Sequence, residues 1–241
     1  MKLFILFFSL FLFVFNIFSV EYLQIYSKNK DLGKDIVIRF EVGEKYNSSF
    51  KLDMFKVFIT PQIACWTEDS SGNLIETLYV TNSFAKQNWL ALVKLDEKET
   101  YRMEVLPYWF SKYLKKTSHK LSYENPLPDS LTSATPFTNF YLNTKITERK
   151  DIYILVEVNM AFDNNNHYPL RTFFGNPNNN GTSGQPPLIY KAKIDIEKSG
   201  ETELKLIGHS NLIDKEANII TDISKITTAK QIINKVVLLV P

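Results

Sequence analysis

The amino-acid sequence predicts an all-β fold, an antiparallel β-sandwich with one or two short helices and a long loop rich in Asn, Gly and Pro. Apolar and polar residues alternate with period two in many short segments, which is the pattern of strands that bury one face. Residues typical of turns separate these segments. Only two stretches show the three-to-four spacing of a helix. About ten short strands with few helices favour two packed antiparallel sheets.

The segment KDIVIRFEV, residues 34–42, shows the alternation most clearly. Ile36, Ile38 and Phe40 point to one side of a strand, while Arg39 and Glu41 point to the other. We therefore expect one face of this strand to be buried and one to be wet. Further strands are expected over residues 55–60, 62–68, 74–81, 88–95, 101–106, 139–146, 151–160, 188–196, 201–208 and 235–240.

The best-supported local unit is a hairpin built from residues 62–68 and 74–81. The intervening segment DSSGN, residues 69–73, has the residue types that turns require. Pro61 lacks a backbone N–H and cannot complete a strand ladder, so it marks a break before the first strand of the hairpin.

Two segments have helical spacing, and one segment reads as a long loop. YWFSKYLKKTSHK, residues 108–120, places apolar residues three or four apart with lysines between them, and ISKITTAKQIIN, residues 223–234, does so more weakly. Asn, Gly, Pro and Ser dominate residues 162–187. Loops of this length usually either perform a function or are disordered, so this segment is a candidate binding loop, with a disordered segment as the alternative.

The first 20 residues have the order of a secretory signal peptide: Lys2, an apolar run over residues 3–15, and a short polar end. The run is shorter than the roughly 20 apolar residues that a membrane span needs, so cleavage near Ser19–Glu21 is favoured over an uncleaved membrane anchor. The exported chain would be one β-sandwich domain of residues 21–241 without a transmembrane span, located in the periplasm or outside the cell.

Charge and cysteine content limit the function classes. The chain has 28 basic and 26 acidic side chains and a net charge of +2, so its overall charge does not favour nucleic acid as a partner. The single cysteine, Cys65, excludes an intramolecular disulfide and is expected to be a buried thiol. The three histidines are widely separated, without a second ligand at the spacing of a zinc site, so no metal site is expected.

Aromatic side chains offer one route to ligand binding. Trp66, Trp89, Trp109, Tyr108 and Tyr113 could stack on a sugar or another flat ligand. Aromatic residues on amphipathic elements also form cores, and the sequence leaves both interpretations open.

Carboxylates offer a second route. Glu68, Asp69, Glu104 and Asp129 could perform acid–base catalysis if two of them met in one cleft with different pKa values. The sequence contains neither a Gly-x-Ser-x-Gly elbow nor a phosphate-binding glycine loop. A hydrolase acting on envelope glycans or peptides is therefore only the third of our hypotheses.

Three segments in this order, PQIACWTEDSSGNLIETLYVT, EVLPYWFSK and DSLTSAT, resemble an uncharacterised bacterial family of predicted periplasmic proteins. That family pairs a Trp-Glu-Asp hairpin with a later Leu-Pro-x-Trp and an Asp-x-x-Thr-x-Ala-Thr turn. The resemblance covers roughly residues 55–196. It implies a secreted, immunoglobulin-like β-sandwich without an established activity, and the genes of the family are associated with flavin transferases and membrane redox modules.

The third segment also resembles the flavin-attachment motif Asp-x-x-(Ser/Thr)-Gly-Ala-Thr, which carries FMN through its phosphate on the final Thr. Asp129, Thr132, Ala134 and Thr135 match this motif, whereas Ser133 replaces the Gly. The resemblance implies Thr135 as the attachment residue, with Asp129 and Thr132 beside it. The flanking prolines and clustered hydroxyls equally explain the segment as a turn that satisfies its own backbone groups.

The leading hypothesis is an exported, non-enzymatic protein that binds an envelope protein or a small ligand and has no cofactor. The predicted binding surface includes the 162–187 loop and the residues Trp66, Glu68, Asp69 and Trp109. The alternative is an envelope electron-transfer protein with covalent FMN. The sequence does not indicate an oligomeric state.

Overall fold

A computed structural model confirms the all-β prediction. Within the residues it describes, strands form most of the regular structure and helices are few and short. The described residues are 22–27, 33–52, 54–89, 102–147, 151–169, 182–210 and 218–241. The predicted signal peptide, residues 1–20, lies outside them.

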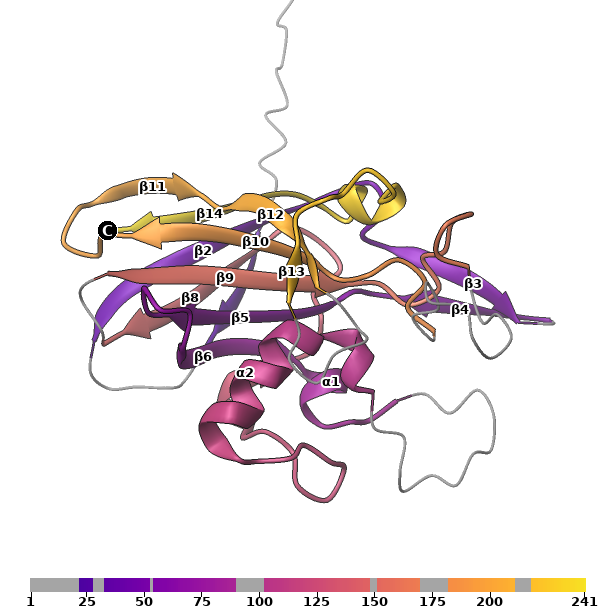
Figure 1. Cartoon of the computed structure of the whole chain (residues 1–241), viewed down its shortest axis with the longest axis horizontal. Coiled ribbons are helices and arrows are strands. Elements are labelled where there is room, and N and C mark those ends of the chain that lie inside the picture. The colour runs from indigo at the N-terminus through magenta and orange to yellow at the C-terminus, as the bar shows by residue number, and fades with distance from the viewer. Residues whose placement is uncertain are drawn as a thin grey trace, which may run out of the picture.

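In the described part of the chain, one sheet has five strands (Figure 1). The order across the sheet is β1 (Leu23–Tyr26), β8 (Phe140–Ile146), β2 (Lys34–Val42), β14 (Ile233–Val240) and β11 (Gly200–Glu203). Neighbouring strands are antiparallel except for β1 and β8, which are parallel.

A second sheet has seven strands within the described ranges. The order is β13 (Ile219–Ile220), β12 (Lys205–Ser210), β10 (Leu188–Ile194), β9 (Ile152–Asn159), β5 (Gln62–Glu68), β6 (Leu74–Thr81) and β7 (Thr132–Ser133). This sheet contains the predicted hairpin, β5 and β6, whose strands pair antiparallel on either side of the 69–73 turn. A separate two-stranded hairpin, β3 (Ser48–Leu52) and β4 (Phe55–Ile59), extends from one end of the molecule (Figure 1).

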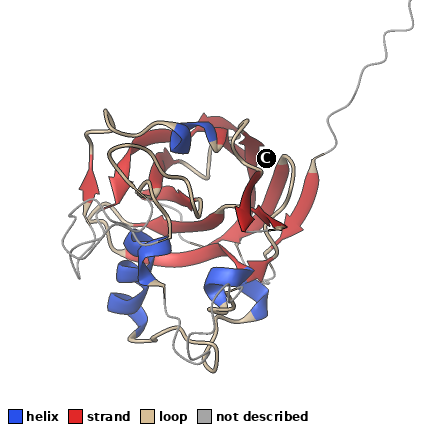
Figure 2. Ribbon diagram, turned by 90° about the vertical axis from the view of Figure 1, so that its right-hand side faces the viewer, coloured by secondary structure: helices blue, strands red, loops and turns tan. Residues whose placement is uncertain are grey.

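The main hydrophobic core joins the two larger sheets, which form two layers (Figure 2). Ile38 and Leu142 contribute from the five-stranded sheet, and Cys65 and Val156 contribute from the seven-stranded sheet. Cys65 is fully buried, as the sequence predicts. Removal of these apolar side chains from water supplies the main favourable term for pairing the layers.

A second core covers the opposite face of the seven-stranded sheet. Helix α1 (Asn82–Ala85) and helix α2 (Pro107–Thr117) pack there, on the side chains of Ala64 and Trp66 among others. Strand β5 is consequently buried on both faces. The four consecutive apolar residues at its centre, residues 63–66, fit a strand that is covered on both sides.

Helix α2 confirms the first helical prediction, but the predictions for residues 101–106 and 223–234 were wrong in part. The segment 101–106 contains the 3₁₀ turn η1 (Met103–Val105) instead of a strand, because Pro107 starts α2 directly after it. The segment 223–234 contains only the short η3 (Thr228–Gln231) before β14 begins. Its β-branched isoleucines favour burial in the sheet core.

The segment 201–208 was predicted as one strand and forms two. The chain changes sheets at Leu204, so β11 pairs with β14 and β12 pairs with β10. Of the predicted strand over 88–95, residues 90–95 lie outside the described residues, and Asn88 and Trp89 are not in a strand.

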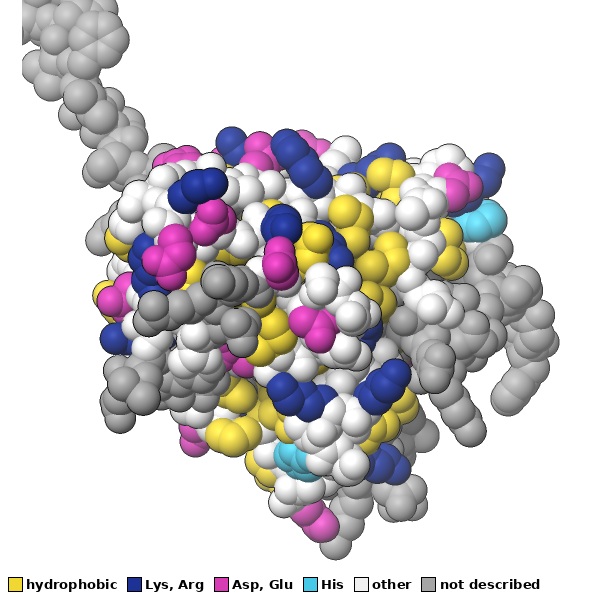
Figure 3. Space-filling model, turned by 60° about the vertical axis from the view of Figure 1, so that its left-hand side comes forward, with side chains coloured by type: hydrophobic (Ala, Val, Ile, Leu, Met, Phe, Trp, Pro, Cys, Tyr) yellow, Lys and Arg dark blue, Asp and Glu magenta, His cyan; other side chains and the backbone are white. Residues whose placement is uncertain are grey.

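Charges of both signs are interspersed on the face of the molecule in Figure 3. This agrees with the small net charge of +2. That face carries no extended field of one sign that would attract a polyanion.

Candidate functional site

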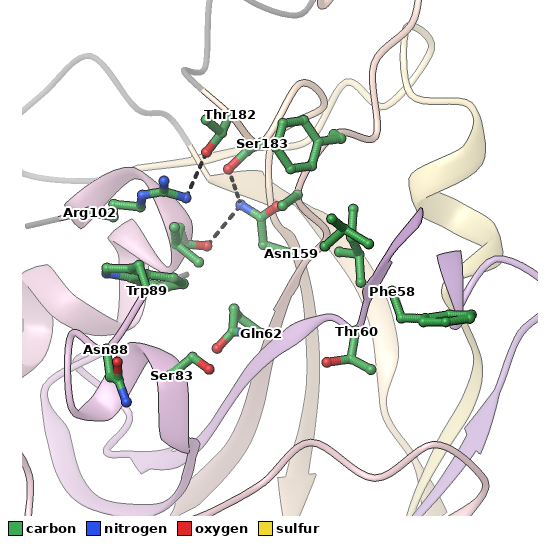
Figure 4. A pocket seen from close by; sticks show the side chains of 15 residues that line it. Phe58, Thr60, Gln62, Ser83, Asn88, Trp89, Arg102, Asn159, Thr182 and Ser183 are labelled. Carbon is green, nitrogen blue, oxygen red and sulfur yellow. Dashed lines mark hydrogen bonds between the residues drawn. The ribbon is translucent and has the colours of Figure 1, made fainter. Parts of the chain in front are cut away.

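A pocket of about 190 Å³ opens at the junction of β4 and β5, and we call it the Trp89 pocket (Figure 4). Five described segments meet there. The lining side chains fall within residues 57–62, 83–89, 102–105, 159–162 and 182–183. Apolar walls with a few converging polar groups are typical of small-molecule sites.

The buried side chain of Gln87 holds one wall of this pocket in place. Its Nε2 donates to the carbonyl of Phe84 over 2.8 Å. Its Oε1 accepts hydrogen bonds from the indole Nε1 of Trp89 and from the backbone N–H of Arg102, both at 3.1 Å. Two residues that are 13 positions apart in sequence are thereby fixed to one amide oxygen.

Arg102 carries the charge of the site. Its guanidinium lies 5.0 Å from the centre of the Trp89 ring, a cation–π contact. Its Nη1 donates to the hydroxyl of Thr182 over 3.0 Å. Among the described residues that line the pocket, Arg102 is the only charged one.

The base of the pocket is tied to helix α1 through Gln62. The Gln62 Oε1 accepts from the hydroxyl of Thr81 at 2.7 Å and from the backbone N–H of Phe84 at 3.2 Å. The second bond satisfies one of the N–H groups that the first turn of a helix leaves unpaired. Gln62 therefore positions α1 against β5.

The two described ends of the predicted 162–187 loop form the remaining wall. The backbone N–H of Phe162 donates to the carbonyl of Thr182 over 2.6 Å. The amide Nδ2 of the buried Asn159 donates to the hydroxyl of Ser183 over 3.1 Å and to the carbonyl of Val105 over 2.9 Å. The sequence singled out this loop as a binding segment, and its described ends line the pocket; residues 170–181 lie outside the described residues.

A network of hydrogen bonds joins the same two loop ends. The backbone N–H of Gln185 donates to the carbonyl of Asp163 over 2.7 Å, and the Thr228 hydroxyl donates to the carboxylate of Asp163. Burial raises the pKa of Asp163. Gly184 has a φ of +75°, and a Cβ there would lie 2.5 Å from the Asp163 carbonyl oxygen, so only glycine fits.

The aromatic residues predicted for the binding surface lie in the second core instead. Trp66 and Trp109 are both fully buried. The indole of Trp66 donates to Glu68 over 3.0 Å, and that of Trp109 donates to the hydroxyl of Thr77 over 3.1 Å. Trp109 therefore attaches α2 to β6, and the ring of Trp66 packs against that of Tyr108 in α2, with 6.0 Å between the ring centroids.

Glu68 and Asp69 have different environments although they are adjacent. The Glu68 side chain is buried, with Lys112 Nζ 3.8 Å from its Oε1, and burial raises its pKa. Asp69 accepts hydrogen bonds from Ser71 and Asn73 in the hairpin turn, and the bonds from Asn73 are the main reason that its pKa is lowered. Glu68 fixes the indole of Trp66, and Asp69 stabilises the turn.

The remaining predicted carboxylates have their own partners. Glu104 is half-buried in η1, and desolvation raises its pKa while Arg102 acts in the opposite direction. Asp129 forms an ion pair with Lys86 at 2.7 Å. None of the contacts found among the described residues joins Glu104 or Asp129 to the Glu68–Asp69 pair.

The residues of the flavin-type motif are engaged in structural contacts. The hydroxyl of Thr135 donates to the carbonyl of Pro61 over 3.0 Å, and the residue is partly buried. Thr132 pairs with Val80 in β7, and Asp129 pairs with Lys86. This arrangement does not present the Thr135 hydroxyl beside a free carboxylate, so the residues fit FMN attachment poorly.

The sequence analysis missed Glu157, a fully buried carboxylate in the middle of β9. Its Oε1 and Oε2 accept from the backbone N–H groups of Tyr108 and Trp109 at 3.1 and 2.8 Å. It thus binds the N-terminus of α2, where a negative charge is favourable. The sequence feature that could have identified Glu157 is a single acidic residue inside the largely apolar segment YILVEVNM, residues 153–160.

Comparison with known proteins finds no matching family model, no matching curated protein and no matching solved structure. Searching the described ranges for helices with the length and apolar content of a membrane span finds none. In the same ranges, no three His, Cys, Asp or Glu side chains gather as candidate metal ligands. The fold and pocket together define an all-β protein with a small preformed cavity.

Proposed function

We propose that this chain is an exported, non-enzymatic protein of the cell envelope that binds a small ligand in the Trp89 pocket. The observation that carries the proposal is the fixed wall of that pocket, in which Gln87 holds both Trp89 and Arg102. A preformed wall lowers the conformational entropy that the protein's side chains lose when a ligand binds. The proposal needs neither a cofactor nor a catalytic residue.

Two further features support binding over a purely structural role. The predicted binding loop contributes both of its described ends to the pocket. The pocket also mixes apolar side chains such as Val57 and Val105 with hydroxyl and amide groups such as Ser83 and Asn88. Such a lining offers both burial of apolar area and a means of fixing a ligand's orientation.

We also propose that the sandwich is immunoglobulin-like and related to the uncharacterised periplasmic family. The contacts of the shared motifs support this, because Trp66, Glu68, Trp109 and Thr135 each hold the fold together. Motifs with structural roles can persist in a family whose ligands differ. Cell fractionation and the intact mass of the native protein test export: a cytoplasmic chain that retains residues 1–20 would contradict it.

A pocket-filling variant tests the binding proposal. Ser83→Phe places a ring into the pocket from α1, whereas Ser70→Phe adds the same ring at the exposed hairpin turn and serves as the matched control. We expect some members of a broad panel of small polar and aromatic compounds to raise the melting temperature of the wild type and of Ser70→Phe, but not of Ser83→Phe. Equal responses in all three proteins, or no response in any, would refute the proposal.

A further inference from the structure

We infer that the Trp89 pocket selects a small uncharged ligand in which a single ring carries an amide-like group, with a hydrogen-bond donor next to an acceptor. The donor of the ligand binds to Asn159, and its acceptor binds to Gln62. This inference rests on the proposed function, since it names the class of ligand that the same pocket takes. It follows from the pairing of these two residues, the groups that their amides leave unused and the size of the cavity.

Gln62 and Asn159 are neighbours on one face of the seven-stranded sheet. They are directly opposed residues at one end of the antiparallel pair β5–β9. Opposed side chains of this kind lie on the same face, with Cβ atoms about 4.5–5.5 Å apart. Both residues line the pocket, and Figure 4 shows Trp89 beside them. One small ligand can therefore contact both amides.

The amide of Asn159 leaves its oxygen unused. Its Nδ2 donates to the carbonyl of Val105 and to the hydroxyl of Ser183. The carbonyl of Val105 can only accept, so it fixes the orientation of the amide, with the nitrogen toward Val105. Asn159 is only 2% exposed, and its Oδ1 has no hydrogen-bond partner in the described part of the chain. A buried acceptor without a partner is costly, so a ligand that donates to it gains affinity.

The amide of Gln62 leaves its nitrogen unused. Its Oε1 accepts from the hydroxyl of Thr81 and from the backbone N–H of Phe84. The N–H of Phe84 can only donate, so it faces the oxygen of the amide and fixes this orientation as well. Within the described ranges, Nε2 of Gln62 donates no hydrogen bond. Its two N–H groups are therefore available to an acceptor on a ligand.

The two unused groups define the chemistry of the ligand. A carboxamide presents the complementary pair, because its N–H can donate to Asn159 Oδ1 while its carbonyl accepts from Gln62 Nε2. A carboxylate has no donor for Asn159, and an ammonium group has no acceptor for Gln62. Sites built around such hydrogen bonds discriminate against analogues that lack one of the groups, since the protein group is then left unpaired.

The volume limits the ligand to one ring. The pocket holds about 190 Å³, and Val57, Ile59 and Val105 give it apolar walls. A dry cavity of about 150 Å³ is sufficient for benzene. A six-membered ring with one small substituent therefore fits, whereas a fused or drug-sized molecule does not.

The test uses four uncharged probes that separate donor, acceptor and ring. Benzamide has all three, acetophenone replaces the NH₂ of benzamide by a methyl group, aniline has donors but no carbonyl, and acetamide has no ring. Their binding to the purified protein is followed by ligand-observed NMR titration at pH 8. Gln62→Glu keeps an oxygen for Thr81 and Phe84 and replaces the Nε2 donors by an acceptor. The matched control is Gln231→Glu, the same change at an exposed residue of η3.

We expect benzamide to bind the wild type and Gln231→Glu about 10-fold more tightly than the other three probes. Gln62→Glu should weaken benzamide by about 10-fold or more, because a carboxylate oxygen then faces the ligand carbonyl, but should not weaken aniline. Thermal unfolding reports whether the variant is folded. If Gln62→Glu does not fold, the comparison of benzamide with acetophenone and aniline in the wild type decides the inference alone.

Several results would overturn the inference. Equal affinity for benzamide and acetophenone would show that no donor is selected, and unchanged benzamide binding in folded Gln62→Glu would show that Gln62 does not bind the acceptor. Acetamide binding as tight as that of benzamide would show that the ring is not selected. If the three ring probes bind equally and Ser83→Phe abolishes that binding, the proposed function stands and only the amide selection fails. If no probe binds, the inference fails, and the wider compound panel decides the proposed function separately.

Discussion

Replacement of Glu157 by Gln should change how the stability of the protein depends on pH. Glu157 lies inside β9 and is fully buried, yet it accepts two hydrogen bonds from the first turn of α2, from Tyr108 and Trp109. The substitution keeps the size of the side chain and removes its titration. It also places an NH₂ group against one of two backbone donors, which costs about 1–3 kcal/mol at every pH.

The magnitude follows from the pKa of the carboxyl group. Desolvation raises the pKa of Glu157 from 4.5 to about 7, although the bonds from Trp109 and Tyr108 act in the opposite direction. Between these two pH values the folded protein binds more protons than the unfolded chain, so the free energy of unfolding falls as the pH rises. The full change from 4.5 to about 7 corresponds to about 3 kcal/mol.

Urea denaturation at pH 5, 6, 7 and 8 measures this effect for the wild type and for Glu157→Gln. Glu68, whose pKa is also raised, contributes to both proteins and cancels in the difference between them. We expect the variant to be less stable at pH 5 and to gain up to about 3 kcal/mol relative to the wild type by pH 8. A difference that stays constant within about 0.5 kcal/mol, near the error of the extrapolation, would refute the reasoning.

Three other predictions concern stability, modification and reactivity. In urea denaturation, Gly184→Ala should lower the free energy of unfolding by about 1–3 kcal/mol more than Gly200→Ala. Both glycines have positive φ, but only at Gly184 would the added Cβ clash, with the carbonyl oxygen of Asp163. Equal losses of stability in the two variants would contradict this. Thr135→Val should cost about 0.5–1.5 kcal/mol through its lost hydrogen bond, and the intact mass of the native wild type should lack FMN; an FMN-sized increment that the variant loses would establish the alternative function. Burial raises the pKa of the Cys65 thiol, so a thiol reagent should label it only in denaturant, and rapid labelling of the folded protein would disprove its burial.

Local signals in the sequence predict the hairpin and the first helix correctly. The strands of the hairpin are rich in apolar, β-branched and aromatic residues, and DSSGN between them has the residue types of a turn, so β5 and β6 follow from neighbouring residues alone. Helix α2 follows from the spacing of its aromatic residues. These elements depend on contacts that are close in sequence.

What covers each face of a strand is not a local property. Successive side chains of β5 point to opposite faces of the sheet, so Cys65 and Trp66 belong to different cores. The sequence does not reveal that α2 covers the face on which Trp66 lies. The predicted surface role of Trp66 is therefore not supported by its burial. The Trp89 pocket was inaccessible to sequence reasoning for the same reason. Five segments that are distant in sequence form the pocket. The sequence analysis identified only the 162–187 loop and the aromatic residue Trp89 as candidates for binding.

The change of sheet at Leu204 has a consequence for how the molecule unfolds. Because β11 leaves the seven-stranded sheet to pair with β14, and β12 returns to pair with β10, one continuous stretch belongs to both layers. Leu204 is buried at the crossing, and its N–H donates to the carbonyl of Val236 over 2.9 Å. Neither layer can separate without breaking this stretch, so the sandwich should melt as one cooperative unit whose folding is slow, since its strands pair across long sequence distances.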